Sequence, residues 1–296
     1  MELRHLKYFL SVAEELHFGR AANNLNIAQP ALSQQIKQLE NELGFLLFNR
    51  TNQKVALTEA GSVFRNRANH ILELLNEAVE ESQQVARGEL GQIKLGFAGM
   101  VTFDLLPLVL HAYREKFPNV TVNLRHLPTS EQVVALNSKE IDIGILILPI
   151  DDESLSYEIL RIESFVMALP KSHPLANEAS IDLTSLVNEK FIMPARSAGS
   201  GFYDSIINTC FNAGFSPKTS QEAQELQTII ALVASGMGIS MVPSSFQTLK
   251  TDSVAYIPIQ NGPANFKTAM AWNKHNVSPI LHSFIEVMKE MGSDGV

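Results

Sequence analysis

Cysteine, tryptophan and long apolar runs are nearly absent from this chain of 296 residues. The single cysteine, Cys210, excludes an internal disulfide and agrees with a reducing cytoplasm. Because Ile206, Ile207 and Phe211 lie near it, we expect a buried structural thiol rather than a redox sensor. No stretch reaches the roughly 18 apolar residues of a membrane span, and the first residues form a polar amphipathic pattern without an apolar signal core. We therefore expect a cytoplasmic protein with no membrane partner.

Patterns that mark catalytic and metal sites are also missing. The eight histidines form no H-x-x-x-H pair, and the sequence has no C-x-x-C, no G-x-S-x-G elbow and no P-loop. His173 is interpreted as a turn residue, and the G-M-G at residues 236–238 as a tight turn rather than a dinucleotide loop. We therefore expect no cofactor, no metal ion and no enzyme activity.

The first sixty residues predict two short helices around a tight turn, then a helix with one apolar and one polar face. Its apolar side carries Leu32, Ile36, Leu39 and Leu43, which we expect to pack on Leu3, Leu6, Phe9, Leu10, Ala13, Ala21, Ala22 and Leu25. The outward side carries short donors and acceptors of the kind that read base edges in a major groove, at Pro30, Ser33, Gln34, Lys37 and Asn41. A generic bundle with a solvated face is the alternative. The Ala-Ala pair, which allows close helix crossing, favours a helix-turn-helix.

A polar tip between two short apolar runs follows this helix. The runs are residues 45–48 and 55–57, and the tip carries Arg50, Asn52, Gln53 and Lys54. This pattern predicts a hairpin wing whose cations, Arg50 and Lys54, contact phosphate or enter the minor groove. Residues 1–60 carry six Lys/Arg and six Asp/Glu, so the net charge of −8 lies outside this module. We expect modest, salt-sensitive nonspecific DNA affinity, which pairing of two modules would raise.

These motifs resemble the LysR-type transcriptional regulators. The resemblance rests on the M-E-L-R-H-L opening, Ala21-Ala22, Q-P-A-L-S at 29–33, L-G at 43–44, L-F-N-R at 47–50 and L-T-E-A-G at 57–61. The chain looks closest to the branch that controls aromatic-acid catabolism, of the benzoate and hydroxycinnamate type. The family implies an α+β multidomain protein, with a winged helix-turn-helix, a long linker helix and a two-lobed α/β effector domain like the periplasmic binding proteins.

The resemblance also implies partners and contact residues. It implies a double-stranded DNA operator, a small organic acid effector, RNA polymerase, and a homodimer or a homotetramer built as a dimer of dimers. The family's DNA-contacting positions fall on Gln29, Pro30, Ser33, Gln34, Lys37 and Arg50. Many members have Arg where this chain has Gln34, so phosphate or guanine contact there should be reduced and the operator preference altered.

A long helix without proline is predicted to follow the wing. Apolar or small residues recur with the heptad period of a coiled-coil seam, at Phe64, Ala68, Ile71, Leu75, Ala78, Ser82 and Val85. We interpret this as homodimerisation; the alternative is a helix that packs on its own effector domain. The predicted domains are residues 1–60 for DNA binding, 61–90 for the linker and 91–296 for the effector domain. Lobe one comprises about 91–161 and 268–296, and lobe two about 162–267.

Strand and helix patterns alternate from residue 92 onward, which is typical of a parallel-rich α/β fold. Strands are predicted at 93–97, 120–124, 141–148, 165–169, 191–193, 239–242, 254–257 and 267–272. Helices are predicted at about 105–116, 130–137 and 278–291. Two crossovers, near Ile162 and Phe266, would create a hinged cleft between the lobes.

Three strand ends face this cleft, and ligands of open α/β sheets bind at such ends beside helix N-termini. The candidate effector-binding residues are Gly99, Met100, Val101, Thr102, Thr129, Ser130, Ile147, Arg196, Phe202 and Thr268. Plain helix capping by Ser or Thr is the alternative at each end, and Arg196 has solvent as its alternative. The predicted effector is a small carboxylate with an apolar body. Some relatives place an Arg after the third strand, where this chain has Leu146, Ile147 and Leu148, so a carboxylate cannot rely on that cation.

Overall fold

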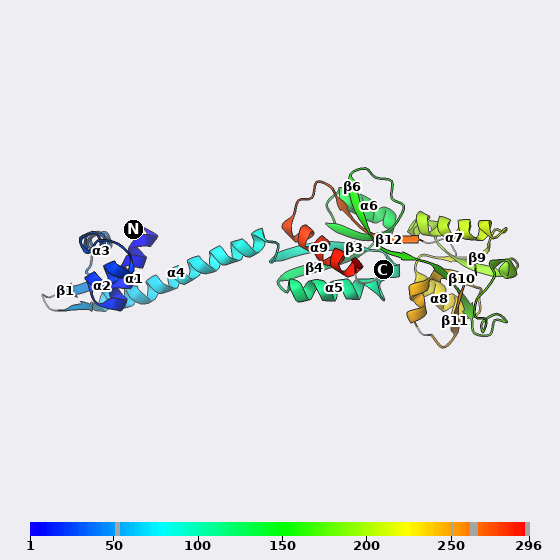
Figure 1. The fold of residues 1–296 in the computed structure, drawn as a ribbon, viewed down its shortest axis with the longest axis horizontal. Coiled ribbons are helices and arrows are strands. Elements are labelled where there is room, and N and C mark those ends of the chain that lie inside the picture. The colour runs from blue at the N-terminus through cyan, green and yellow to red at the C-terminus, as the bar shows by residue number, and fades with distance from the viewer. Residues whose placement is uncertain (51–53, 250, 261–265, 294–296) are drawn as a thin grey trace. The chain divides into compact units, whose positions relative to one another are not determined.

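The computed structural model describes residues 1–50, 54–249, 251–260 and 266–293. It divides into two compact units, Met1–Gln83 and Gln84–Val296, each of which has its own core. Figure 1 shows the elements of both units and labels most of them. None of the helices within these described ranges has the length and apolar composition needed to cross a membrane.

The N-terminal unit is a winged helix-turn-helix, as the sequence predicts. Its elements are α1 (Leu3–Glu15), α2 (Phe18–Asn24), α3 (Gln29–Leu43), β1 (Phe48–Arg50), β2 (Val55–Leu57) and α4 (Glu59–Ala86). Strands β1 and β2 pair antiparallel. The α3 side chains Leu32, Ile36 and Leu39 are fully buried. Phe9 of α1 contacts the rings of Phe48 and Phe64, so the three helices, the wing and the start of α4 share one core.

Three packing predictions for this unit need correction. Leu3, expected in the core, is exposed because it is the first residue of α1 and lies at the edge of the bundle. Phe64 and Ala68, expected in an intermolecular seam, pack instead on the core of their own unit. Ala68 is completely buried there, whereas Ile71 and Val85 further along α4 are exposed. The heptad pattern therefore combines residues of the unit's own core with exposed apolar residues.

The wing joins α4 through close backbone packing. Thr58 donates its hydroxyl to the carbonyl of Leu46 at 2.8 Å and accepts the N–H of Gly61 at 2.8 Å. A Cβ at position 61 would lie 2.1 Å from the carbonyl oxygen of Leu47. Glycine is therefore required at position 61 because the helix approaches the wing backbone too closely for any side chain.

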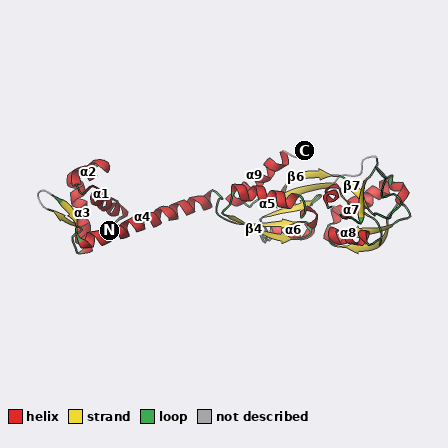
Figure 2. Cartoon of the chain, turned by 90° about the horizontal axis from the view of Figure 1, so that it is seen from below, coloured by secondary structure: helices red, strands yellow, loops and turns green. Residues whose placement is uncertain are grey.

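Lobe one of the second unit is a five-stranded sheet of order β4-β3-β5-β12-β6. The strands are β3 (Gly91–Phe97), β4 (Val120–His126), β5 (Ile143–Ile147), β6 (Leu155–Glu163) and β12 (Phe266–Asn273). Strand β3 runs parallel to β4 and β5, and β12 runs antiparallel to β5 and β6. Helices α5 (Leu105–Lys116) and α9 (Pro279–Ser293) cover one face and α6 (Thr129–Asn137) the other (Figure 2).

Gln132 of α6 explains why two strands of this lobe carry glycine where they pass it. Its side chain is fully buried and donates to the carbonyls of Leu127 and Ile145 at 2.9 and 3.1 Å. A Cβ on Gly144 would lie 2.5 Å from Gln132 Oε1, and one on Gly96 would lie 3.3 Å away. The buried amide therefore occupies the space that larger residues on β3 and β5 would need.

Lobe two contains an antiparallel sheet of order β10-β7-β11 and a parallel pair, β8-β9. The strands are β7 (Phe165–Pro170), β8 (Lys190–Pro194), β9 (Lys218–Ala223), β10 (Ser240–Pro243) and β11 (Val254–Pro258). A bridge between Phe191 and Ile239 joins the two pieces. Helices α7 (Ser200–Asn212) and α8 (Leu226–Ala234) pack on them. Cys210 of α7 is fully buried.

The chain passes between the lobes at the two places that the sequence predicts. Strand β6 ends at Glu163 and β7 begins at Phe165, while β12 begins at Phe266. Two strands, β6 and β9, have no counterpart in the predicted list. Both lie at a sheet edge, and their mixed polar and apolar residues leave many side chains exposed, which weakens the alternation that marks a strand.

Candidate DNA-reading surface and effector cavity

The outward face of α3 carries the residues predicted to read DNA. Helix α3 begins at Gln29 with Pro30 in its first turn, where a missing N–H costs nothing. Gln29, Pro30, Gln34 and Lys37 are exposed and Ser33 is half-buried, while the apolar residues of the same helix face the core. This surface therefore presents amide, hydroxyl and ammonium groups on a rigid helix, which is the chemistry that reads base edges and phosphates.

Arg50 at the end of β1 is paired inside its own unit. Its Nη2 lies 2.8 Å from Oε2 of the buried Glu40, and its guanidinium lies over the ring of Phe18 at 4.8 Å. Arg50 thus helps to fix the wing on α3, and a contact with phosphate remains a prediction. Lys54, immediately before β2, is exposed. The predicted tip residues Asn52 and Gln53 lie outside the described residues.

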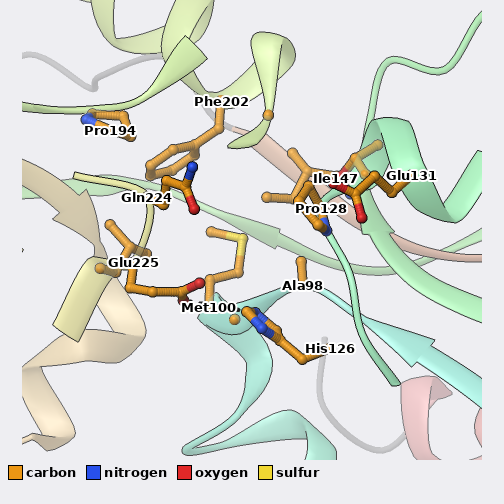
Figure 3. A pocket seen from close by; sticks show the side chains of 14 residues that line it. Ala98, Met100, His126, Pro128, Glu131, Ile147, Pro194, Phe202, Gln224 and Glu225 are labelled. Atoms are coloured by element: carbon orange, nitrogen blue, oxygen red, sulfur yellow. Dashed lines mark hydrogen bonds and ion pairs between the residues drawn. The ribbon is translucent and has the colours of Figure 1, made fainter. Parts of the chain in front are cut away.

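A cavity of about 210 Å³ lies between the two lobes of the effector domain. Lobe one contributes the ends of β3, β4 and β5 and the start of α6; lobe two contributes β8, α7 and α8. The lining residues are Ala98, Gly99, Met100, His126, Pro128, Thr129, Glu131, Ile147, Pro194, Gly199, Phe202, Gln224, Glu225 and Leu226 (Figure 3). A cavity of about 150 Å³ in another protein accommodates benzene, so this one has room for a single substituted ring.

Five of the predicted effector-binding residues line this cavity: Gly99, Met100, Thr129, Ile147 and Phe202. Met100 and Phe202 project toward the same space from opposite lobes, and Ile147 faces them (Figure 3). Ser130 lines an adjoining hollow of about 270 Å³ that shares Thr129 and Ile147 with the cavity. The apolar walls are therefore assembled from segments far apart in the sequence.

Four predicted residues are placed elsewhere. Val101 is fully buried in the core, and Thr102, after the short 3₁₀ helix, does not line the cavity. Thr268 is fully buried on β12 between β5 and β6. Arg196 is 67% exposed and pairs with Asp204 at 3.2 Å, so its side chain points to solvent rather than into the cavity. The position of each residue in the sequence suggests the cleft, but tertiary packing sets the direction of its side chain.

No sequence pattern predicts the polar end of the cavity. His126, the last residue of β4, places Nε2 3.6 Å from Oε2 of Glu225, which immediately precedes α8. Gln224 adds an amide at this end, whereas the second carboxylate of the lining, Glu131, lies in the first turn of α6 on the opposite side of the cavity (Figure 3). Neither lysine nor arginine occurs among the described lining residues. The only available signal was position, because His126 lies at the end of a strand and Glu225 just before the start of a helix, and no motif links them.

Two helix N-termini from different lobes meet at the other end of the cleft. Helices α6 and α7 begin at Thr129 and Ser200, and neither has a side-chain cap. Thr129 and Gly199 line the cavity, and Ser130, Ser200 and Gly201 line the adjoining hollow. Their first-turn N–H groups lack helical acceptors, so this end of the cleft has the donors and the dipole that favour an anion.

Phe202 connects the cavity wall to both crossovers. Its ring centroid lies 5.5 Å from that of Phe165, the first residue of β7, and 5.5 Å from that of Phe266, the first residue of β12. The ring centroids of Phe165 and Phe266 lie 5.1 Å apart. A ligand that displaces Phe202 would therefore press on the two strands at which the chain changes lobe.

Comparison with known proteins matches both units. Residues 3–62 match the model of the bacterial regulatory helix-turn-helix protein, lysR family, and residues 86–293 match that of the LysR substrate binding domain. The chain belongs to the LysR family of DNA-binding transcriptional regulators. It is 43% identical over 287 residues to the transcriptional regulator AlsR of Bacillus subtilis, covering 97% of this chain and 95% of AlsR.

Solved structures of the family resemble the whole chain or its effector domain. The structure of full-length CbnR complexed with its target DNA has a TM-score of 0.86 at 27% identity and covers 99% of this chain and 100% of CbnR. The effector binding domain of BenM with its effector benzoate has a TM-score of 0.62 at 30% identity, covering 69% of this chain and 93% of that domain. The predicted fold class is thereby confirmed. The relatives and the fold are those of transcriptional regulators, not of enzymes.

Proposed function

We propose that this LysR-family regulator changes its operator binding when a small organic acid, most suitably an aromatic carboxylate, binds between the effector lobes. The observation that carries the proposal is the pair of uncapped helix N-termini, one from each lobe, at a single cavity. In this assignment residues 1–60 read double-stranded DNA in the cytoplasm, 61–90 link the modules and 91–296 bind the effector.

The two ends of the ligand have distinct partners in this proposal. Its carboxylate binds the N–H groups at the starts of α6 and α7, together with the Thr129 hydroxyl, and its apolar body lies against Met100, Ile147 and Phe202. The cavity volume suits one ring, and the benzoate bound by the BenM effector domain supports an aromatic acid. The helix dipoles replace the missing arginine as the favourable electrostatic contribution.

Ligand binding changes the lobe arrangement through the aromatic residues at the crossovers. Phe202 contacts the ligand on one side and Phe165 and Phe266 on the other. An acid that contacts both helix N-termini binds a closed arrangement better than an open one. Such a difference in affinity is required, because a ligand that binds both arrangements equally shifts nothing.

The DNA response requires more than one copy of the chain. The exposed apolar residues of α4, including Ile71 and Val85, support pairing with a second α4 into a homodimer, and two dimers would form a tetramer. Changed spacing of the reading heads would then alter DNA bending and contact with RNA polymerase. Two linked DNA-binding units also compensate for the neutral net charge of a single unit.

Fluorescence anisotropy with the DNA upstream of the protein's own gene tests the proposal. Wild type should bind this DNA over competitor, and a small aromatic acid should change the binding curve. Thr129→Val should preserve DNA binding and blunt the acid response, and Thr129→Ser, which keeps the hydroxyl, should restore it. An intact dose–response curve in Thr129→Val would contradict the placement of the carboxylate. Absence of preference for any duplex, with or without acids, would overturn the proposal as a whole.

A further inference from the structure

Side chains from both lobes form the polar end of the cavity, and this end contains a hydrogen-bond acceptor that has no donor. Glu225 is held from lobe one by His126, at 3.6 Å between Nε2 and Oε2. Within the described residues, this is the only ion pair of the Glu225 carboxylate, and no side chain donates a hydrogen bond to its Oε1. The side chains of Glu225 and His126 are 42% and 43% exposed, and both line the cavity. A bound molecule can therefore reach this carboxylate directly.

Gly99 makes this arrangement possible. A Cβ at position 99 would lie 2.7 Å from Glu225 Oε2 and 2.9 Å from His126 Nε2. Any larger residue would push the carboxylate and the imidazole away from the backbone turn after β3. The missing side chain thus places Glu225 against the floor of the cavity, beside Met100 (Figure 3).

The charge of the cavity selects among ligand groups. Glu225 carries a carboxylate, and neither lysine nor arginine occurs among the described lining residues to offset it. A second carboxylate on a ligand would be repelled here, since like charges at short range disfavour each other. An apolar end would leave Glu225 without a compensating hydrogen bond, whereas a hydroxyl or amino group would donate to it.

We infer that the effector is a small monocarboxylic acid that carries a hydroxyl or amino donor at the end opposite its carboxylate, and that Glu225, positioned by His126 and Gly99, accepts that donor. The inference rests on the proposed function, because the carboxylate is placed at the N-termini of α6 and α7. It adds a second recognition point, which distinguishes a hydroxy or amino acid from the unsubstituted acid and from the diacid.

Two matched ligand series test the inference by isothermal titration calorimetry on the full chain. One comprises benzoate, 4-hydroxybenzoate and terephthalate; the other comprises hexanoate, 6-hydroxyhexanoate and adipate. In at least one series the hydroxy acid should bind about ten-fold tighter than the unsubstituted acid, as expected for one hydrogen bond to a half-exposed carboxylate. The diacid should bind more weakly than either.

Variants separate the role of Glu225 from general effects on the domain. Glu225→Met, similar in size and without an acceptor, should reduce the preference for the hydroxy acid to within about two-fold. Glu225→Gln, which keeps one acceptor oxygen, should retain part of it. Gly99→Ala should also reduce the preference by displacing the carboxylate. Glu222→Gln, an exposed acid on β9 outside the cavity lining, should leave the preference unchanged.

Each outcome bears on a different claim. If the unsubstituted acids bind and the hydroxy acids have no advantage, or if Glu225→Met keeps the advantage, the inference is wrong and the proposed function stands. If none of the six acids binds, both are overturned. Thermal unfolding of every variant, monitored by circular dichroism, checks that a lost preference does not reflect an unfolded domain.

Discussion

Arg50 Nη2 lies 2.8 Å from Glu40 Oε2, and this contact joins the wing to the reading helix. Glu40 is buried and also accepts the N–H groups of Leu47 at 2.9 Å and Phe48 at 3.2 Å. One carboxylate on α3 therefore receives three donors from the segment that forms the first strand of the wing. This side chain therefore helps to orient the wing on α3, together with the shared core around Phe48.

Replacing Glu40 by Gln should destabilise the N-terminal unit. Gln keeps one acceptor but leaves Arg50 without a charge partner, so the free energy of unfolding should fall by about 1.5–3 kcal/mol, the range for hydrogen bonds to charged groups. Urea unfolding of the full chain, monitored by circular dichroism, measures the change. Glu14→Gln, at an exposed position of α1, is the matched control and should have almost no effect. Equal stability of the two variants would contradict the role given to Glu40.

The reading face of α3 should carry sequence preference and the wing should not. If the amide of Gln29 contacts a base edge, Gln29→Ala should weaken operator binding by ~1–3 kcal/mol and relax the preference at one base pair. Lys37→Ala should weaken binding to all duplexes and reduce the slope of log K against log salt by about 0.9 if it contacts one phosphate. Anisotropy titrations at several salt concentrations measure both.

Arg50→Ala provides the corresponding test for the wing. A phosphate contact predicts weaker binding to all sequences and a flatter salt dependence; an unchanged slope would mean that Arg50 acts only through Glu40. Gln221→Ala, on an exposed position of β9 in the effector domain, is the control and should bind DNA as wild type does.

The exposed part of α4 should govern the oligomeric state. Ile71→Glu places a charge on the predicted seam, where Ile71 is exposed in the single chain, and should lower the mass measured by analytical ultracentrifugation. Asn66→Glu adds the same charge at an exposed position on the opposite side of the heptad and should leave the mass unchanged. If both variants keep the mass of wild type, α4 does not provide the pairing surface.

Gly144 and Gln132 should be energetically coupled. A Cβ on Gly144 would lie 2.5 Å from Gln132 Oε1, whose amide is held by two carbonyls, so Gly144→Ala should cost about 1–3 kcal/mol as an overpacked substitution. In Gln132→Ala the clash is gone, and the added methyl should cost much less. A double-mutant cycle by urea unfolding measures this coupling, and additive effects would show that the contact is not limiting.

Cys210 should contribute a stability change at alkaline pH. Burial raises the pKa of the Cys210 thiol to about 11 from its ordinary value of 9.0. The folded state thus holds the proton more tightly, and this contribution is fully present below pH 9 and lost as the pH rises toward 11. Between pH 9 and 10, stability should fall more steeply in wild type than in Cys210→Ala, by up to about 1.4 kcal/mol per pH unit. Parallel pH profiles would contradict this prediction.

Local pattern was sufficient for most of the architecture. The period of Leu32, Ile36 and Leu39, the pair Ala21-Ala22 and the apolar runs of the wing predict the winged helix-turn-helix, because these signals lie within a few turns of one another. The crossovers near residues 162 and 266 were also predictable, since strand patterns end and restart there. Edge strands β6 and β9 were missed because their half-exposed faces weaken the alternation.

What the sequence by itself determined is which segments become helices and strands and which faces are apolar, since periodicity is written into neighbouring residues. Only the tertiary structure decided where those faces go. It buried Ala68 in the core of the N-terminal unit rather than in a coiled-coil seam. It turned Arg196 toward Asp204 and Arg50 toward Glu40, and it brought His126 within 3.6 Å of Glu225 from the other lobe. The physical reason is that side-chain direction and long-range contacts depend on sheet register and chain crossing, which no local pattern encodes.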